Sequence, residues 1–162
     1  EHSGTVSLVD LDARTEVAEI PVGHRPIDVA VNSSTGVAVV TLAADHDDDD
    51  EEEEDGKPVK GLVALVDLIS RVVIDRVPVG RRPWGVAVDP GLNIAIVANR
   101  NSDSVSIVDL EFRITVAEFD TGRHPVDVSV NPRTHVAAVA NLEDGTITLV
   151  DVTTPATPAL AA

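Results

Sequence analysis

The sequence predicts an all-β protein built from repeated antiparallel units. Three observations support this class: a Val-Asp-Leu motif recurs along the chain, a Gly-x-x-Pro turn recurs between its copies, and the composition favours strands. Hydrophobic residues make up 43% of the 162 residues, but aromatic residues only 2%. The core must therefore consist of Val, Ile, Leu and Ala, and Val-rich segments suit pleated strands better than helices.

The two motifs set the length of the repeat. Successive Val-Asp-Leu or Val-Asp-Val motifs are 57, 42 and 42 residues apart, counted at Asp10, Asp67, Asp109 and Asp151. The Gly-x-x-Pro turns keep spacings of 57 and 42, at Gly23, Gly80 and Gly122. A fixed period of this length indicates one supersecondary unit per repeat. The first interval exceeds the others by 57 − 42 = 15 residues and contains an acidic run, which we interpret as an insertion.

Each unit is predicted to contain four strands. In the last copy, strands cover 126–130, 135–141 and 145–152, separated by turns rich in Asn, Pro, Asp and Gly. The fourth strand appears in the earlier copies, over 71–77 and 113–119. Four short strands in about 42 residues are typical of a β-propeller blade. The remaining strands are expected over 4–10, 14–20, 27–31, 37–42, 61–67, 85–89, 93–99 and 104–110.

The order of these strands predicts an incomplete ring. Labelled A to D from the propeller centre outward, they run C-D, A-B-C-D, A-B-C-D, A-B-C. The fold class is a β-propeller segment of about three four-stranded antiparallel blades, which is too few because rings close with about four to eight. Blades occupy 1–152, the acidic loop is inserted at 45–59, and a Thr/Pro/Ala linker-like tail covers 153–162. Expected partners are the remaining blades of a longer propeller or further copies of the chain.

The motifs resemble the YVTN-type β-propeller repeat family. Residues 21–26 and 78–83 match its Pro-Val-Gly-x-x-Pro turn, and the strand ends at Asn99 and Asn141 match its Tyr-Val-Thr-Asn strand without the Tyr. In the first copy this strand ends at Leu42 and loses the Asn. The resemblance implies an extracellular, periplasmic or cell-envelope location.

Function is predicted less closely than fold, because propellers host unrelated activities. Nucleophile-elbow, phosphate-loop and paired-histidine motifs are absent from the sequence, and no cofactor is expected. This favours a non-catalytic binding or scaffold segment. The alternative, implied by propellers that resemble this one, is part of a quinoprotein-dehydrogenase-like or lactonase-like enzyme with its site at the channel mouth.

Candidate ligand-binding residues lie in the turns that join strand D of one blade to strand A of the next. These turns emerge at the channel mouth of a propeller, and arginine forks bind carboxylates and other anions. The alternative is that they are solvated turn residues. The candidates, including two aspartates just beyond the turns, are His24, Arg25, Asp28, Arg81, Arg82, Arg123, His124 and Asp127.

The acidic run carries most of the net charge of −16. It holds ten of the 28 acidic residues, so the rest of the chain has 18 acids against 12 bases. Asp47, Asp48, Asp49 and Asp50 are weak cation candidates, but dense like charge favours a solvated, disordered loop. Because no basic stripe is present, we expect no nucleic-acid partner. No apolar run is long enough for a transmembrane segment.

Two further features have structural interpretations. Each Asp of the Val-Asp-Leu motif is followed four residues later by Arg, as at Asp67 and Arg71. We expect the carboxylate to accept turn hydrogen bonds and to face that arginine across the C–D turn. Trp84, the single tryptophan, occupies a position filled by Ile27 and Val126 in other copies, so packing at the start of strand A is favoured over ligand binding.

Overall fold

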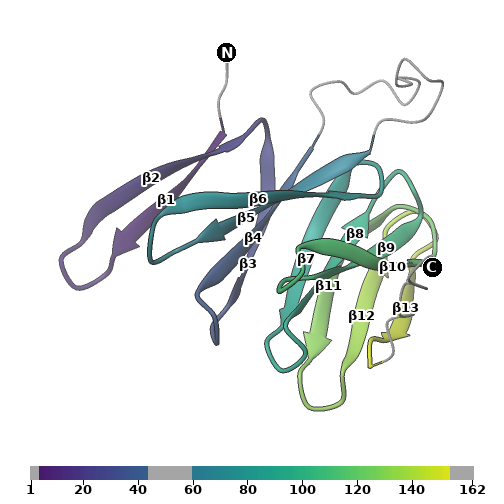
Figure 1. Ribbon diagram of the computed structural model, residues 1–162. Helices are drawn as coiled ribbons and strands as arrows, with labels where there is room; N and C mark the ends of the chain where they lie inside the picture. The colour runs from purple at the N-terminus through teal and green to yellow at the C-terminus, as the bar shows by residue number, and fades with distance from the viewer. Residues whose placement is uncertain (1–3, 44–59, 154–162) are drawn as a thin grey trace, which may run out of the picture.

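The computed structural model describes residues 4–43 and 60–153, in which 13 strands form four antiparallel sheets (Figure 1). The first sheet contains β1 (Gly4–Asp10) and β2 (Thr15–Gly23). The second contains β3 (Pro26–Asn32), β4 (Val37–Leu42), β5 (Gly61–Asp67) and β6 (Val72–Val79). The third contains β7 (Pro83–Asp89), β8 (Ile94–Asn99), β9 (Ser104–Asp109) and β10 (Ile114–Asp120). The fourth contains β11 (Pro125–Asn131), β12 (Val136–Asn141) and β13 (Thr146–Asp151).

The sheets are blades 1 to 4 of a propeller arc. Blades 2 and 3 have all four strands in the order A-B-C-D, blade 1 has the C and D strands, and blade 4 has A, B and C. The A strands of successive blades are neighbours, with β3 beside β7 and β7 beside β11. The predicted fold class and strand order are confirmed. Blade 1 and blade 4 lie at opposite ends of the arc (Figure 1).

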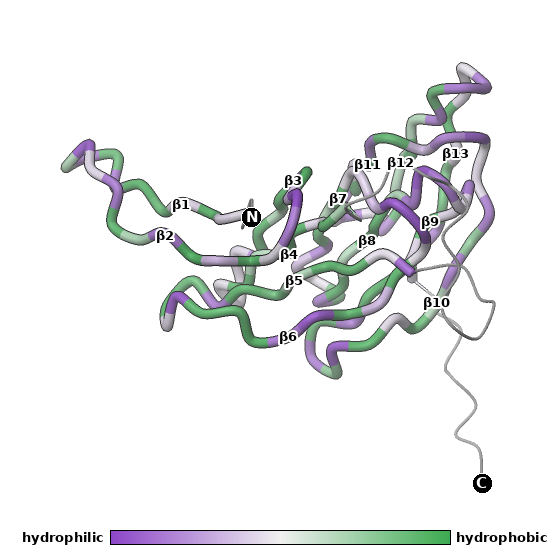
Figure 2. Tube along the Cα trace, turned by 90° about the horizontal axis from the view of Figure 1, so that it is seen from above, coloured by the Kyte–Doolittle hydropathy of each residue, from purple (hydrophilic) through white to green (hydrophobic). Residues whose placement is uncertain are grey.

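The core lies between the blades, because both faces of each sheet are apolar. Strand β5 illustrates this: Val63 and Leu65 pack against blade 3, whereas Ala64 and Val66 pack against blade 1. Alternate residues of a strand point to opposite faces, so a run of consecutive apolar residues serves two interfaces. Hydrophilic residues gather at the turns, as at the end of the β1–β2 hairpin (Figure 2).

The C–D turns confirm one half of the predicted Asp–Arg contact and correct the other. Asp67 Oδ1 accepts hydrogen bonds from the backbone N–H groups of Ile69, at 2.7 Å, and Ser70, at 3.0 Å. Arg71, however, donates to the carbonyl of Val17 in the preceding blade, at 3.2 Å. The predicted Asp–Arg contact was wrong because Asp67 is engaged by the turn backbone. Outward carbonyls of an edge strand such as β2, in contrast, lack ladder partners.

The same cross-blade contact recurs one blade later. Arg113 donates to the carbonyl of Ile74 in β6, at 3.4 Å, and lies 4.0 Å from the carboxylate of Asp75. These arginines therefore join the outer strands of neighbouring blades. As exposed contacts they add little stability.

Two predicted segments lie outside the described residues. They are the acidic run with its cation candidates, within 44–59, and the tail from 154 onward. The part of the chain that the structure describes contains no helix long and apolar enough to cross a membrane.

Candidate functional site

The D–A turns and the B–C turns meet at one end of the blades. In blades 2, 3 and 4 the B–C turn donates a backbone hydrogen bond to the D–A turn that precedes the A strand. The bonds run from Ala43 to Arg25, from Arg100 to Arg82 and from Leu142 to His124, at 3.1, 3.1 and 2.9 Å. The D–A turns contain His24, Arg25, Arg81, Arg82, Arg123 and His124, so these residues share one end of the blades, which we call the mouth face.

A repeated asparagine–glycine contact fixes the mouth face. Asn99, the last residue of β8, donates through Nδ2 to the hydroxyls of Ser104 and Ser106, at 3.1 and 2.9 Å. Ser106 Oγ also accepts the N–H of Gly80, at 3.3 Å. A Cβ on Gly80 would lie 2.6 Å from the Asn99 side chain. Blade 4 repeats the arrangement with Gly122, Asn141, Thr146 and Thr148.

This contact changes the expected role of the turn glycines. The sequence predicts that all of them adopt positive φ, but among the three only Gly23 does, at 124°. At Gly80 and Gly122 the requirement is close approach to an asparagine side chain. The left-handed conformation falls instead on the residue before the proline, at Arg25, Arg82 and His124, with φ of 43°, 49° and 52°.

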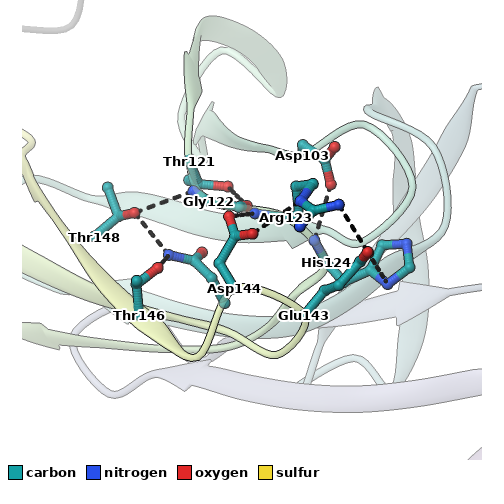
Figure 3. A network of polar contacts seen from close by, with 10 residues as sticks. Asp103, Thr121, Gly122, Arg123, His124, Glu143, Asp144, Thr146 and Thr148 are labelled. Atoms are coloured by element: carbon teal, nitrogen blue, oxygen red, sulfur yellow. Dashed lines mark hydrogen bonds and ion pairs between the residues drawn. The ribbon is translucent and has the colours of Figure 1, made fainter.

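In the last D–A turn, Arg123 forms ion pairs with two carboxylates of the neighbouring B–C loop (Figure 3). Arg123 Nε donates to Asp144 Oδ1, and its Nη1 donates to Glu143 Oε1, both at 2.8 Å. The pKa of Arg123 is raised by its hydrogen bond to Asp144 and by the charge of Glu143. The pKa of Asp144 is lowered, first by the backbone N–H of Arg123 and then by its side chain.

His124 is held by the same loops. Its Nδ1 lies 3.2 Å from Glu143 Oε2, and its backbone N–H donates to Asp103 Oδ1 of blade 3, at 2.8 Å (Figure 3). Arg123 and His124, two of the predicted ligand contacts, are therefore committed to carboxylates of the chain itself. Their side chains therefore stabilise the turn itself.

The two predicted aspartates serve the backbone. Asp28 Oδ1 accepts the N–H of Val29, and its Oδ2 accepts the N–H of Val86 in the next blade, at 2.8 and 2.9 Å. Asp127 Oδ1 accepts the N–H of Val128, at 2.9 Å. Asp28 therefore joins blades 2 and 3, and Asp127 occupies the equivalent position on blade 4.

Trp84 lies close to two arginine side chains. The Arg100 guanidinium carbon is 5.1 Å from the Trp84 ring centroid, and that of Arg82 is 5.9 Å. Both distances fall in the range of cation–π contacts. Trp84 is only half-buried, and Arg100 Nε is buried without a hydrogen-bond partner among the described residues. The Trp84 ring and the two guanidinium groups together form a cationic cluster on the mouth face.

Three features were not predicted from the sequence. One is Arg100, and the other two are polar links between neighbouring blades, which lie at the end of the blades opposite the mouth face. Asn32 Nδ2 donates to Asn93 Oδ1 of the next blade, at 2.8 Å. At the following junction the buried Asp89 lies 2.7 Å from His135 Nδ1. Both links join the end of an A strand to the A–B turn of the next blade. Their positions follow the repeat spacing, which was the one signal available in the sequence.

The described segments, 4–43 and 60–153, contain no group of three or more His, Cys, Asp and Glu side chains placed to hold a metal ion.

Comparisons with known proteins show a structural likeness but no family. No family model matches the sequence, and no curated protein matches it. Among solved structures, the chain is similar to hydrazine synthase of Kuenenia stuttgartiensis, with 12% identity and a TM-score of 0.48. The match covers 92% of this chain and 65% of the hydrazine synthase chain, so this chain spans less than two thirds of that protein's length.

Proposed function

We propose that the chain is a non-catalytic binding scaffold, an arc of blades that further blades complete. One observation carries this proposal. Val105 and Ile107 of β9 are fully buried against blade 4, whereas the equivalent Ile147 and Leu149 of β13 are 63% and 69% exposed. Large apolar side chains gathered on one sheet face indicate an interaction surface.

The polar groups of blade 4 support the same proposal. Asp28 binds the next blade through Oδ2, but Asp127 accepts only a local N–H through Oδ1 among the described residues. Within the described residues, the Asn131 side chain likewise accepts only the N–H of Arg133, whereas the side chain of the equivalent Asn32 also bonds to the next blade. The outer face of blade 4 thus presents apolar and polar groups in the pattern that elsewhere receives a neighbouring blade.

The ligand-binding part of the proposal rests on the cluster around Trp84. Arg100 has a buried Nε without a hydrogen-bond partner in the described part of the chain, and its guanidinium contacts the aromatic ring on the mouth face. A guanidinium of this kind suits a carboxylate-bearing ligand, because the planar fork matches two carboxylate oxygens. An extracellular, periplasmic or cell-envelope location also belongs to this proposal and rests on the repeat resemblance.

A chain extended by one repeat tests the scaffold role. A second copy of residues 111–152, placed directly after Val152, would add a D strand to blade 4 and the A, B and C strands of a further blade. Hydrogen exchange should then slow across β11 to β13, and the added unit should unfold together with the rest. The control carries Val139→Lys in the copied segment, because Val139 packs against the preceding blade. An added unit that stays unfolded, or folds without protecting β13, would refute the scaffold proposal.

A further inference from the structure

The inner edge of β1 borders an unfilled cleft of about 350 Å³. In blades 2, 3 and 4 a B strand pairs with this edge of the C strand, but β1 pairs only with β2 among the described strands. The residues that line the cleft come from β1, β3 and β4: Thr5, Val6, Ser7, Pro26, Ile27, Asp28, Val29 and Val40. Val29 is 48% exposed there, whereas its equivalent in blade 3, Val86, is buried.

The residues at this edge of the C strand and at the end of the B strand follow a pattern that recurs in the blades. Where a C strand has hydroxyl residues five and three positions before its turn aspartate, the B strand ends in asparagine. In blade 3 these residues are Ser104 and Ser106 with Asn99. In blade 4 they are Thr146 and Thr148 with Asn141. The amide oxygens of both asparagines lack partners among the described residues, so the two hydroxyls are what these amides bind.

Blade 2 shows the other form of the pattern. Its C strand has Leu62 and Ala64 at the two hydroxyl positions, and its B strand ends in Leu42. An asparagine amide buried against Leu62 and Ala64 would lose its hydrogen bonds, which is costly in a desolvated site. The three positions therefore change together, and the C strand indicates which residue ends its B strand.

Strand β1 has the hydroxyl form. Thr5 and Ser7 lie five and three residues before Asp10. Thr5 Oγ1 donates to Glu19 Oε1 at 2.9 Å, which reproduces the bond from Ser104 Oγ to Glu118 Oε1 in blade 3. With its proton given to Glu19, the Thr5 hydroxyl has lone pairs left to accept an amide proton.

We propose that the cleft beside β1 binds a β-strand that ends in asparagine, the B strand of an A–B hairpin of the same repeat. Backbone pairing with the free edge of β1 would give affinity, and the asparagine would give specificity. A second copy of this chain offers no such strand, because its B strands are already paired on both edges. The inference rests on the proposed scaffold role, to which it adds the partner of the other end of the arc.

The test uses a fluorescent peptide spanning residues 125–141, which form the β11–β12 hairpin and end in Asn141. Fluorescence anisotropy would compare its binding to the full chain with that of a peptide carrying Asn141→Leu. We expect the asparagine peptide to bind about tenfold more tightly, because the leucine has no amide proton to donate to the hydroxyl oxygens of Thr5 and Ser7. Hydrogen exchange should slow at the β1 amides when it binds.

The matched chain variant is Thr5→Leu with Ser7→Ala, which copies the pattern of blade 2. In this background the preference should reverse or vanish. Circular dichroism would confirm that the variant folds, as blade 2 shows that this backbone accommodates those side chains. Equal affinity of the two peptides for the unmodified chain, or an unchanged preference in the variant, would overturn the inference.

An isolated hairpin peptide is only marginally stable in water, so a second experiment joins the hairpin covalently to the chain. A copy of residues 125–145 placed before Thr5 raises the effective concentration of the hairpin. Urea unfolding of the four combinations of Asn or Leu at the strand end with the two β1 patterns forms a double-mutant cycle. Additive effects would overturn the asparagine pattern. The scaffold proposal is tested separately at blade 4, so the two can fail independently.

Discussion

Leu65 and Leu149 provide a matched pair for testing the blade-to-blade core. Both lie two residues before the turn aspartate of a C strand, and both are leucines. Leu65 is fully buried against blade 3, whereas Leu149 is 69% exposed. Truncation to alanine removes the same atoms from the same position of the repeat, but Leu65 has a neighbouring blade and a paired D strand that Leu149 lacks among the described residues.

The expected magnitudes differ enough to be measured. Leu65→Ala should lower the free energy of unfolding by about 2–5 kcal/mol, because it removes buried apolar atoms and leaves a cavity. Leu149→Ala should change it by about 0.5 kcal/mol or less, because the side chain is already largely in water. At about 2–4 °C of Tm per kcal/mol for a chain of this size, the first variant should melt well below the second.

Urea denaturation followed by circular dichroism measures both variants, and calorimetry gives their Tm. Blade arrays can unfold in steps, so each transition should be fitted separately. A concentration series with sedimentation controls for association, which would bury Leu149. Equal losses in a monomeric chain would refute the reasoning, since Leu149 would then already be covered.

Three further predictions address the turns and the mouth face. Asp67→Asn should destabilise the chain at neutral pH, and its difference from the unmodified chain should shrink below about pH 4. The pKa of Asp67 is lowered by the N–H groups of Ser70 and Ile69, so its contribution is lost as acid protonates it; urea unfolding across pH checks this. Gly80→Ala should cost about 1–3 kcal/mol by overpacking, and adding Asn99→Ala should recover part of the loss in the same assay. Succinate should change the emission of the single tryptophan, and Arg100→Ala should abolish that response in a fluorescence titration.

Much of the fold follows from local sequence signals. Val-Asp-Leu marks the end of a C strand and its turn, and Gly-x-x-Pro marks the start of an A strand. Both depend on a few adjacent residues, so strand order can be predicted from spacing alone. The structure bears this out even where β2 extends to Gly23, a few residues beyond the predicted strand. Once the two motifs have set the boundaries of each repeat, the neighbours of every strand within a blade can be predicted.

Side-chain partners across blades could not be predicted in the same way. Arg71 sits four residues from Asp67 in sequence, yet it bonds to Val17 in another sheet. The D–A turn residues share one end of the blades, but the carboxylates that bind Arg123 come from a loop whose course depends on tertiary structure. Spacing in the sequence pairs each arginine with the nearest acidic residue along the chain. In the folded protein, Arg71 instead donates to a backbone carbonyl at the edge of the neighbouring sheet.

The contacts between blades divide into two kinds that do different work. The apolar faces are alike at every junction, since Val, Ile, Leu and Ala fill equivalent positions. They supply most of the free energy but discriminate poorly between one blade and another. The polar links differ: Asn32 with Asn93 joins blades 2 and 3, whereas Asp89 with His135 joins blades 3 and 4. Exchanging one member of either link would leave a polar group buried without its partner, which is costly. The polar links therefore distinguish one junction from the other, whereas the apolar faces stabilise both.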